Sequence, residues 1–290
     1  MIILVAGGSG QVAQSLAALS TPEHRFVALG RPDLDICDRA SIEAAITAHR
    51  PDAVINAAAY TAVDKAEQEA DLAFAVNETG AGNLASVAHQ AGLPILHLST
   101  DYVFAGNKDG SYTEDDPVDP QSVYGRSKLA GEIAVAGANP RHVILRTAWV
   151  FSPYGNNFLK TMLRLAGDRD VVRVVADQWG SPTYAPDIAN GLAAVLRKAL
   201  GAPSDPSWCG TFHMTGDGTC SWADFAQEIF RQSATRGGAS ARVEPIPTAE
   251  YPTPAKRPAN SRLDNTRFNA VFGSPLPAWQ DGVKRCLAAL

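Results

Sequence analysis

The chain has 290 residues, of which 46% are hydrophobic and 19% are charged. This length and composition predict a large apolar core that needs no disulfide or metal cross-link, arranged in two lobes rather than one. Its 25 basic and 30 acidic residues give a net charge of −5, which disfavours nucleic acid and membrane surfaces as partners. A small anionic ligand stays compatible, because a few local cations suffice to hold it.

The cysteines and histidines are too scattered to indicate a metal or redox site. Cys37, Cys209, Cys220 and Cys286 form no C-x-x-C pair, and the histidines show no H-E-x-x-H spacing. This usage predicts reduced thiols and no bound metal. The apolar residues 1–6 carry no basic leader and run directly into glycine, so they are too short for a signal-peptide core or a membrane span. We therefore expect a cytoplasmic protein.

The first half of the chain alternates short apolar runs with longer helical segments. Strands are expected at residues 2–6, 26–29, 53–56, 94–98 and 143–146, and helices at 11–19, 39–49, 66–90 and 124–138. Apolar strands separated by helices predict a parallel sheet covered on both faces, which is a doubly wound, Rossmann-like α/β fold. Residues 171–175 and 186–200 are expected to add a further strand and helix to the same layer.

Beyond residue 200 the pattern is less regular. A segment rich in proline, glycine and serine at 201–207 precedes an expected strand at 211–214 and a helix that begins near Ser221. The proline-rich stretch 243–262 disfavours a helix or a central strand, and a helical segment follows at 277–290. We expect residues 1–150 to form the doubly wound domain, which 171–200 rejoins, and residues 151–290 to form a smaller lobe at the carboxyl edge of the sheet.

A glycine-rich segment, Gly7-Gly8-Ser9-Gly10-Gln11-Val12-Ala13, lies between the first predicted strand and the first helix. Gly7 and Gly10 allow a tight turn and a close approach of the backbone to a pyrophosphate, and the small Ala13 lets the helix pack on the sheet. The helix N-terminus offers free N–H groups to the phosphates. An ordinary glycine-rich turn is the alternative, but the position of the segment favours a dinucleotide site.

The end of the second strand bears on the choice of dinucleotide. NAD-binding proteins usually place an acid there, whereas this chain reads Leu29-Gly30-Arg31. Arg31 can pair with a 2′-phosphate, which favours NADPH and leaves NADH possible; a solvated surface arginine is the alternative. Asp35 and Ile36 follow and can flank the adenine.

Tyr124 and Lys128 are four residues apart on a predicted helix, so both face the same side. An ammonium near a phenol favours the ionised form, so we expect Lys128 to lower the pKa of Tyr124 and to suit it for proton transfer. The spacing alone also fits an ordinary amphipathic helix. Thr100 closes the fourth strand, where ligands bind in such folds, and its hydroxyl can either bond a substrate carbonyl or cap the strand. Together the three residues predict a hydride-transfer site.

The chain resembles the dTDP-4-dehydrorhamnose reductase family, which belongs to the extended short-chain dehydrogenases/reductases, over essentially its whole length. The motifs that carry this resemblance, besides the glycine segment, Thr100, Tyr124 and Lys128, are NAAAYTAVDKAE at 56–67, STDYVF at 99–104, RTAWV at 146–150, GNNF at 155–158, DQWGSPT at 177–183, YPTPAKRP at 251–258 and WQDGV at 279–283.

This resemblance implies that NADPH reduces the C4 ketone of dTDP-4-dehydro-L-rhamnose to give dTDP-L-rhamnose, in dTDP-rhamnose and polysaccharide biosynthesis. Tyr124 would donate the proton, Lys128 would hold the nicotinamide ribose, and Thr100 would bond the reacting oxygen. Gly7, Arg31, Asp35 and Ile36 are expected to bind the cofactor, as discussed above. The other expected cofactor residues are Gly10, Gln11, Val12, Ala59, Tyr60, Thr61, Tyr124 and Lys128. The expected substrate residues are Thr100, Asp101, Trp149, Lys256, Arg257 and Arg262.

Several of these substrate residues also have plainer interpretations. Lys256, Arg257 and Arg262 are candidate partners of the substrate diphosphate, and solvated loop charges are the alternative. Trp149 matches a substrate contact of the family and would otherwise be a core aromatic. The loop 101–123 is long enough to form a lid or a pocket wall.

One departure from the family concerns its assembly. Some members are dimers that Mg²⁺ bridges through three glutamates, and the matching positions here are Ser15, Pro186 and Ala289, none of which can ligate as a carboxylate. We therefore expect no metal bridge, and a monomer or a differently built homodimer.

Two other functions fit the same motifs. One is a reductase or epimerase of another nucleotide sugar, since this set of residues serves several such reactions. The other is a non-catalytic NADP-binding regulatory subunit, which Thr100, Tyr124 and Lys128 disfavour because a binding module has no need of a phenol–ammonium pair.

Overall fold

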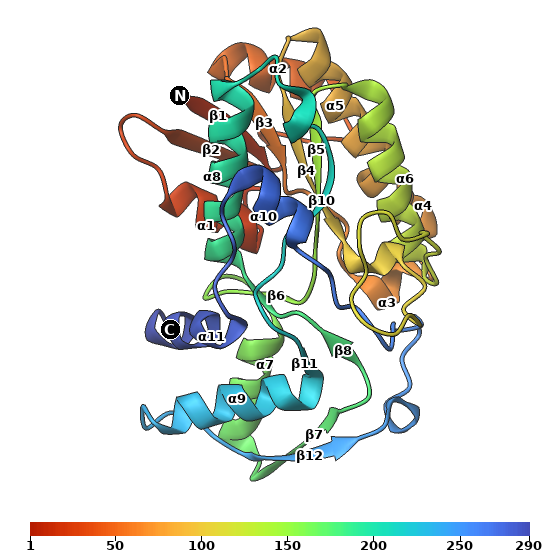
Figure 1. Ribbon diagram of the computed structural model, residues 1–290, viewed down its shortest axis with the longest axis vertical. Coiled ribbons are helices and arrows are strands. Elements are labelled where there is room, and N and C mark those ends of the chain that lie inside the picture. The colour runs from red at the N-terminus through yellow and green to blue at the C-terminus, as the bar shows by residue number, and fades with distance from the viewer.

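The computed structural model describes residues 1–290 and has two lobes stacked along its long axis (Figure 1). The larger lobe contains a six-stranded sheet in the order β10-β5-β4-β3-β1-β2, and every strand pairing in it is parallel. Its strands are β1 (Ile2–Ala6), β2 (Arg25–Leu29), β3 (Ala53–Asn56), β4 (Ile95–Thr100), β5 (His142–Thr147) and β10 (Gly210–His213). The direction of winding reverses between β1 and β3, and sheets of this kind bind ligands outside the carboxyl ends of the strands at such a point.

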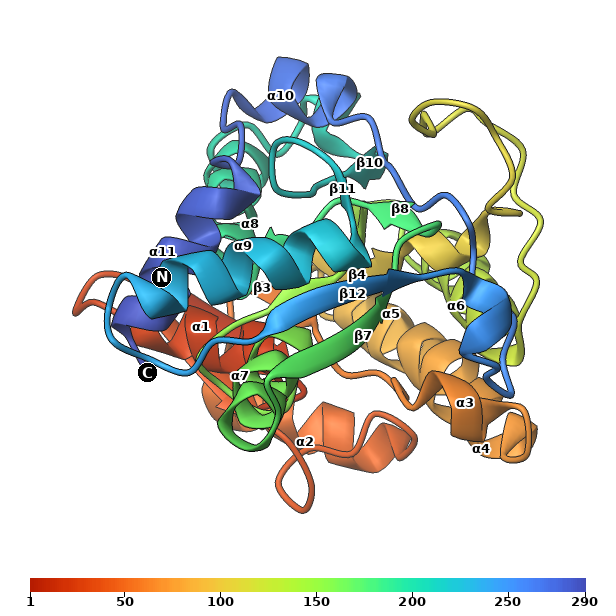
Figure 2. The ribbon, with the colours of Figure 1, turned by 90° about the horizontal axis from the view of Figure 1, so that it is seen from below.

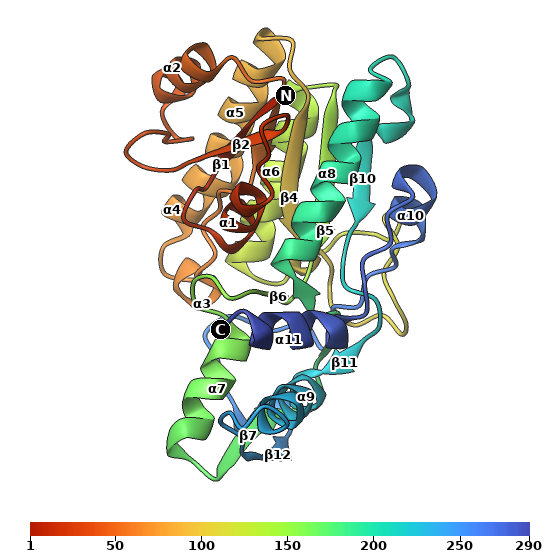
Figure 3. The same cartoon turned by 90° about the vertical axis from the view of Figure 1, so that its left-hand side faces the viewer.

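Helices cover both faces of this sheet. One face is covered by α1 (Gln11–Ala18), α8 (Ala185–Gly201) and α10 (Thr266–Phe272), and the other by α2 (Arg39–His49), α5 (Ala81–Gln90) and α6 (Val123–Ala138). Figure 3 shows α1 and α8 in front of the sheet. Because alternate strand residues meet opposite layers, Ile3 packs with the α1 and α8 side and Leu4 with the α2 and α5 side. The predicted doubly wound α/β fold is confirmed.

The smaller lobe has its own apolar core. Figure 2 views it from below, with the parallel strands β7 and β12 side by side. Its main elements are α7 (Phe158–Asp168), β7 (Val171–Val175), α9 (Trp222–Ala234), β12 (Arg242–Ile246) and α11 (Trp279–Ala288). The remaining short elements are β6 (Val150–Phe151), β8 (Trp179–Gly180), β9 (Thr183–Tyr184), β11 (Cys220–Ser221), and the 3₁₀ turns η2 (Asp101–Val103), η3 (Pro206–Trp208) and η4 (Thr248–Glu250).

Two strands lie in the opposite lobe from the one that the sequence predicts. Residues 171–175 are expected in the main sheet, but they form β7 and pair with β12 in the smaller lobe. Residues 211–214 are expected in the smaller lobe, but β10 is the outer strand of the main sheet, beside β5. The physical reason is burial: Val172 and Val174 are buried around an exposed Arg173, which suits a sheet with one covered face, whereas Phe212 joins the core beneath α8. The helix expected at 186–200 does lie on the main sheet, as α8.

The long helix expected at 66–90 is interrupted. It consists of α3 (Val63–Ala66), α4 (Ala70–Phe74), the π-helical segment η1 (Ala75–Gly80) and α5. The wider π turn directs the Asn77 side chain inward, where Nδ2 donates to Ser127 Oγ at 2.9 Å and to the Tyr60 carbonyl at 3.1 Å. Asn77 Oδ1 accepts from the Tyr60 amide at 2.8 Å. The interruption therefore ties the chain after β3 to α6.

Two further observations concern the cysteines and the helices. All four cysteines are free thiols, two of them buried. None of the helices has the length and the apolar composition that crossing a membrane requires.

The close approach of α6 to η1 depends on glycine at position 131, because a Cβ there would lie 2.0 Å from the Asn77 carbonyl oxygen. We expect Gly131→Ala to lower the free energy of unfolding by about 1–3 kcal/mol through overpacking. Gly137→Ala is the matched control, since it adds the same methyl group to the same helix with nothing within 4 Å, and it should stabilise the protein by up to about 1 kcal/mol. Urea unfolding followed by circular dichroism measures both; equal effects of the two variants would contradict the close contact.

Candidate active site

The turn after β1 forms a bare backbone cradle. Gly7 has φ of +96°, and a Cβ on it would lie 2.7 Å from the Ala58 amide nitrogen, so only glycine fits there. The amides of Gly7 and Gly8 both donate to the Leu29 carbonyl, at 2.9 and 2.8 Å, which fixes the turn against β2. Gly10 begins α1 without any side-chain cap. The first amides of α1 are therefore free to bind an anionic group such as a pyrophosphate.

A cleft of about 530 Å³ runs from this turn along the carboxyl edge of the sheet. It brings together eleven of the twelve residues predicted to bind the cofactor: Gly7, Gly10, Gln11, Val12, Arg31, Asp35, Ile36, Ala59, Thr61, Tyr124 and Lys128. Tyr60 does not line the cleft, because its phenol turns away to donate to Glu69 at 2.6 Å. The arrangement has the shape of an extended dinucleotide site, with Arg31 and Asp35 at one end and Tyr124 and Lys128 at the other.

Several residues of this cleft escaped the sequence analysis. Thr147 and Val150 line it just after β5, and Gly155 and Asn156 line it from the segment that precedes α7. Gly155 and Asn156 belong to the GNNF motif, which could have indicated their place in the cleft. Gln11 shows why the segment lies there: its side-chain oxygen accepts from Ser152 Oγ at 2.8 Å and from Asn157 Nδ2 at 3.0 Å.

Tyr124, Lys128 and Thr100 meet where α6 passes the end of β4. Ser122 caps α6 by accepting from the Gly125 amide at 3.1 Å, which sets the first turn of the helix. Lys128, one turn after Tyr124, donates from Nζ to the Leu98 carbonyl at 2.7 Å. Thr100 lies beside the Tyr124 phenol. The Thr100 hydroxyl donates to Asp101 Oδ1 at 3.0 Å.

Burial dominates the protonation of this group, which corrects one expectation. The sequence predicts that Lys128 lowers the pKa of Tyr124, but burial raises the pKa of the phenol, and the neighbouring Thr100 hydroxyl opposes this only in part. Burial also lowers the pKa of Lys128 to about 8, against the attraction of Glu132. Tyr124 is therefore a neutral phenol near neutral pH, which is the form that can donate a proton.

A second cleft of about 920 Å³ opens between the two lobes. Its walls come from α7, β7, the segment after β12, and Tyr102 of η2, whose ring meets that of Tyr124 edge to face at 5.4 Å between centroids. Arg257 lines it and donates to Asp64 Oδ2 at 2.6 Å and to Tyr102 Oη at 3.2 Å. The cleft thus begins beside the catalytic candidates and extends into the smaller lobe.

The other two predicted diphosphate partners lie outside this cleft. Lys256 is exposed, with Nζ donating to Gln121 Oε1 at 3.3 Å. Arg262 is engaged with Asn260 Oδ1 at 2.8 Å and lines neither cleft. Of the three cations in the proline-rich stretch, the structure places only Arg257 at the candidate substrate site.

Asp101 begins η2 directly after β4, and Trp149 lies between β5 and β6; neither of them lines either cleft. Asp101 is buried, and this burial raises the pKa of its carboxyl to about 6, against the hydrogen bond that Thr100 donates to Oδ1. Trp149 is half-buried and stacks on Trp222, with 3.5 Å between the ring centroids and 9° between the planes. Trp222 lines the larger cleft, and the sequence analysis did not single it out.

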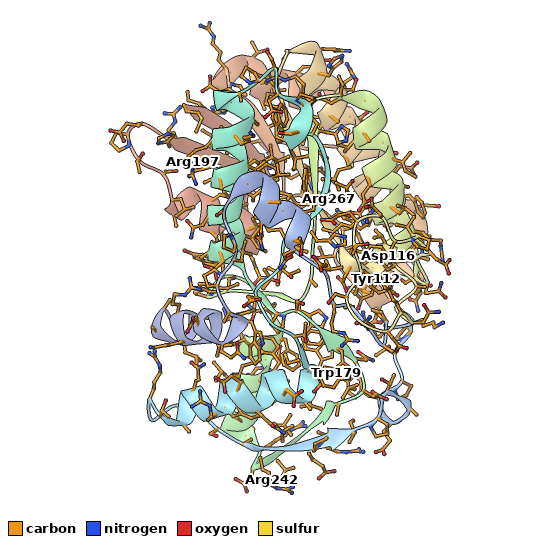
Figure 4. All side chains as sticks on the ribbon, viewed as in Figure 1. Tyr112, Asp116, Trp179, Arg197, Arg242 and Arg267 are labelled. Carbon is orange, nitrogen blue, oxygen red and sulfur yellow. The ribbon has the colours of Figure 1, made fainter.

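The loop between η2 and α6, for which the sequence predicts a lid or a pocket wall, is held to the rest of the larger lobe by hydrogen bonds. Figure 4 shows Tyr112 and Asp116 within this loop. Tyr112 Oη accepts from the amides of Asn107 and Lys108, at 3.0 and 3.1 Å, while Asn260 Nδ2 donates to two loop carbonyls at 2.7 Å each. Glu114 accepts from the amide of His213 in β10 at 2.8 Å. These hydrogen bonds hold the loop against β10 and the proline-rich stretch, and its residues line neither of the two clefts.

The pKa of Lys128 generates a prediction about cofactor binding. Because that pKa is lowered to about 8, the ammonium is charged below this pH and loses its proton above it. The dissociation constant of anionic NADPH should therefore rise between about pH 7 and about pH 9, and the Lys128→Met variant should bind weakly with no such rise. Titration of NADPH fluorescence measures this, with Lys284→Met on the exposed side of α11 as control. An undiminished rise in Lys128→Met would assign the titration to another group.

Comparison with known proteins agrees with this geometry. All 290 residues match the family model described as RmlD substrate binding domain. A dTDP-4-dehydrorhamnose reductase of Sinorhizobium fredii is 48% identical over 290 residues, covering 100% of this chain and 98% of the relative. The crystal structure of such a reductase from Clostridium acetobutylicum superposes with a TM-score of 0.91 at 39% identity, covering 100% of this chain and 99% of that one. The Bacillus anthracis enzyme, solved in complex with NADP, has a TM-score of 0.90 at 34% identity, with coverage of 100% and 99%. The chain belongs to the dTDP-4-dehydrorhamnose reductase family.

Proposed function

We propose that this protein uses NADPH to reduce the C4 ketone of dTDP-4-dehydro-L-rhamnose, giving dTDP-L-rhamnose in dTDP-rhamnose biosynthesis. Its full-length relatives carry the name of this reductase, at 48% identity in one case. The observation in the molecule that carries the proposal is the meeting of two clefts at Tyr102 and Tyr124. A cofactor in one cleft and a nucleotide sugar in the other would lie on the two sides of this contact between the rings.

The cofactor cleft fits a dinucleotide phosphate. A Cβ on Gly7 would fill the space against Ala58, and α1 begins at Gly10 with free amides, so a pyrophosphate can approach the backbone closely. Arg31, at the end of β2, supplies the positive charge that a 2′-phosphate requires. When bound, NADPH supplies the hydride of the reaction.

The protein residues then manage the proton and the position of the ketone. Tyr124, which burial keeps neutral, donates its proton to the oxygen at C4 as negative charge develops there. Thr100 holds the same oxygen through its hydroxyl. Lys128 orients the nicotinamide ribose, and its charge stabilises the phenolate that remains after proton donation. The Leu98 carbonyl keeps Lys128 Nζ in place at 2.7 Å.

The larger cleft suits a sugar nucleotide. Its 920 Å³ is ample for a bulky ligand, and its lining combines aromatic and aliphatic side chains with arginines. We assign the substrate diphosphate to Arg257, which Asp64 and Tyr102 hold in a fixed direction. Asp101 and Trp149 would contact the sugar. This division assigns cofactor binding to the larger lobe and substrate binding mainly to the smaller one.

We also propose a cytoplasmic protein that is a monomer or a homodimer without a Mg²⁺ bridge. The four free thiols support a reducing compartment. Ser15, Pro186 and Ala289 occupy the three positions that match the metal-binding glutamates of some relatives. Ser15 is buried, and its hydroxyl donates to the Gln11 carbonyl at 2.8 Å. Pro186 lies in the first turn of α8, and Ala289 follows α11. None of them offers a carboxylate.

Tyr124→Phe tests the chemistry directly, because it removes only the phenolic oxygen. We expect kcat with dTDP-4-dehydro-L-rhamnose to fall by about 10²–10⁴, the usual worth of a positioned general acid. The NADPH dissociation constant should change little, since the ring is retained. NADPH oxidation followed by absorbance measures the rate. Unchanged turnover in the variant would remove Tyr124 from the mechanism and would favour a role in binding or regulation.

Arg31→Ala tests the cofactor preference. The variant should weaken NADPH binding by about 10-fold or more and leave NADH binding nearly unchanged, because only NADPH carries the 2′-phosphate that a guanidinium can pair with. Arg25→Ala, at the opposite end of β2, is the matched control and should alter neither. Equal losses for the two cofactors would reject the 2′-phosphate role of Arg31.

A further inference from the structure

Trp149 has a backbone conformation that its side chain does not favour. Its φ is +48°, and Arg50 is the only other non-glycine residue with a positive φ. Such strain is maintained only where the surroundings over-determine it, and it is concentrated at functional sites. Arg50 simply ends α2 in the left-handed conformation, whereas Trp149 lies between β5 and β6 with no helix to end. A separate set of contacts must therefore hold Trp149.

Two contacts from beyond β5 hold the Trp149 ring. Trp222, at the start of α9, covers the face of the indole, with 3.5 Å between the centroids and 9° between the planes. Gly180 of β8 lies against the indole, where a Cβ would come within 2.3 Å of Trp149 Cε2. Trp222 is in turn supported by Phe158 of α7, at 4.5 Å between centroids. The strained residue is thus clamped by β8, α7 and α9.

The stack also lies between the two clefts. Trp149 has cofactor-cleft residues on both sides in the chain, Thr147 and Val150. Its partner Trp222 lines the larger cleft together with Phe158. Trp149 and Trp222 are both half-buried and lie at the margin of the smaller lobe's core rather than inside it. Simple core packing accounts for neither the strained backbone nor the position at the cleft.

We propose that Trp222 is a positioning residue for the ketosugar: through the stack it holds Trp149 against the sugar at the junction of the two clefts. The inference rests on the proposed function and extends it to a residue in the wall of the larger cleft, which acts on the reacting groups through Trp149. Its physical basis is that a large flat partner immobilises an indole that would otherwise relax its backbone and lose its fixed orientation. Cofactor binding should not depend on the pair, because neither ring lines the cofactor cleft.

A double-mutant cycle tests this dependence. Trp222→Ala should raise KM for dTDP-4-dehydro-L-rhamnose by about 3- to 10-fold, the worth of one aromatic pair, and should leave the NADPH dissociation constant unchanged. Trp222→Phe should recover part of the loss, and Trp222→Leu, which fills space without a flat face, should not. Because Trp222 acts through Trp149, the Trp149→Ala/Trp222→Ala double variant should have a KM no higher than that of Trp149→Ala alone.

Trp279→Phe is the matched control. Trp279 belongs to the same core and meets Phe225 edge to face, but it does not contact the stack through its ring. It should lower the thermal midpoint without changing KM, and its effect on stability should add to that of Trp149→Ala.

The outcomes separate the inference from the proposed function. Wild-type protein that does not oxidise NADPH with the ketosugar refutes the function. Wild-type turnover with an unchanged KM in both Trp222→Ala and Trp222→Leu refutes the positioning role alone. Additive losses in the Trp149/Trp222 double variant, or an equal rise of KM in Trp279→Phe, would likewise overturn it, because they would show independent or merely structural effects.

Discussion

A buried ion pair beneath the active site holds the catalytic helix on the sheet. Arg146 of β5 donates to Glu132 of α6 from Nε and Nη2, at 2.9 and 2.7 Å, and both side chains are almost fully buried. Ser99 of β4 donates to the same carboxylate at 2.5 Å. Removal of either ion would leave the other charge buried without a partner, at a cost of about 3–5 kcal/mol. The angle of α6 against β4 and β5 is therefore strongly restrained, and the positions of Tyr124 and Lys128 beside Thr100 follow from it.

The same burial sets the charges that the chemistry needs. It keeps the Tyr124 phenol protonated and holds the pKa of His97 well below its usual range, so His97, which contacts Asn56 at 3.0 Å, is neutral beneath the sheet edge. Lys128 is the one cation of the catalytic group, and Glu132 one turn farther along α6 favours its charged form. A neutral acid beside a restrained cation suits ketone reduction, in which negative charge develops on oxygen.

The motifs near strand ends were the parts of the site most open to prediction. Gly7, Gly10, Thr100 and the Tyr124–Lys128 pair each lie at the boundary of an element, and parallel strands bring such boundaries to one edge. For residues in loops far along the chain it was harder to predict whether they line the site, because loop geometry depends on contacts that composition does not encode. Arg262 carries the same charge as Arg257, yet the Asn260 side chain holds it away from both clefts.

The sequence by itself determined the periodicity of burial, the glycine turn, the catalytic triplet and, through its motifs, the family. Only the tertiary structure decided which lobe receives β7 and β10, because both read as short apolar strands and their partners lie more than sixty residues away. The structure alone also showed that Tyr60 turns outward and that Trp222 covers Trp149. The physical reason is the same in each case. Local pattern follows from side chains that are neighbours in the chain, whereas a shared cleft, a stack or a raised pKa depends on atoms that folding brings together.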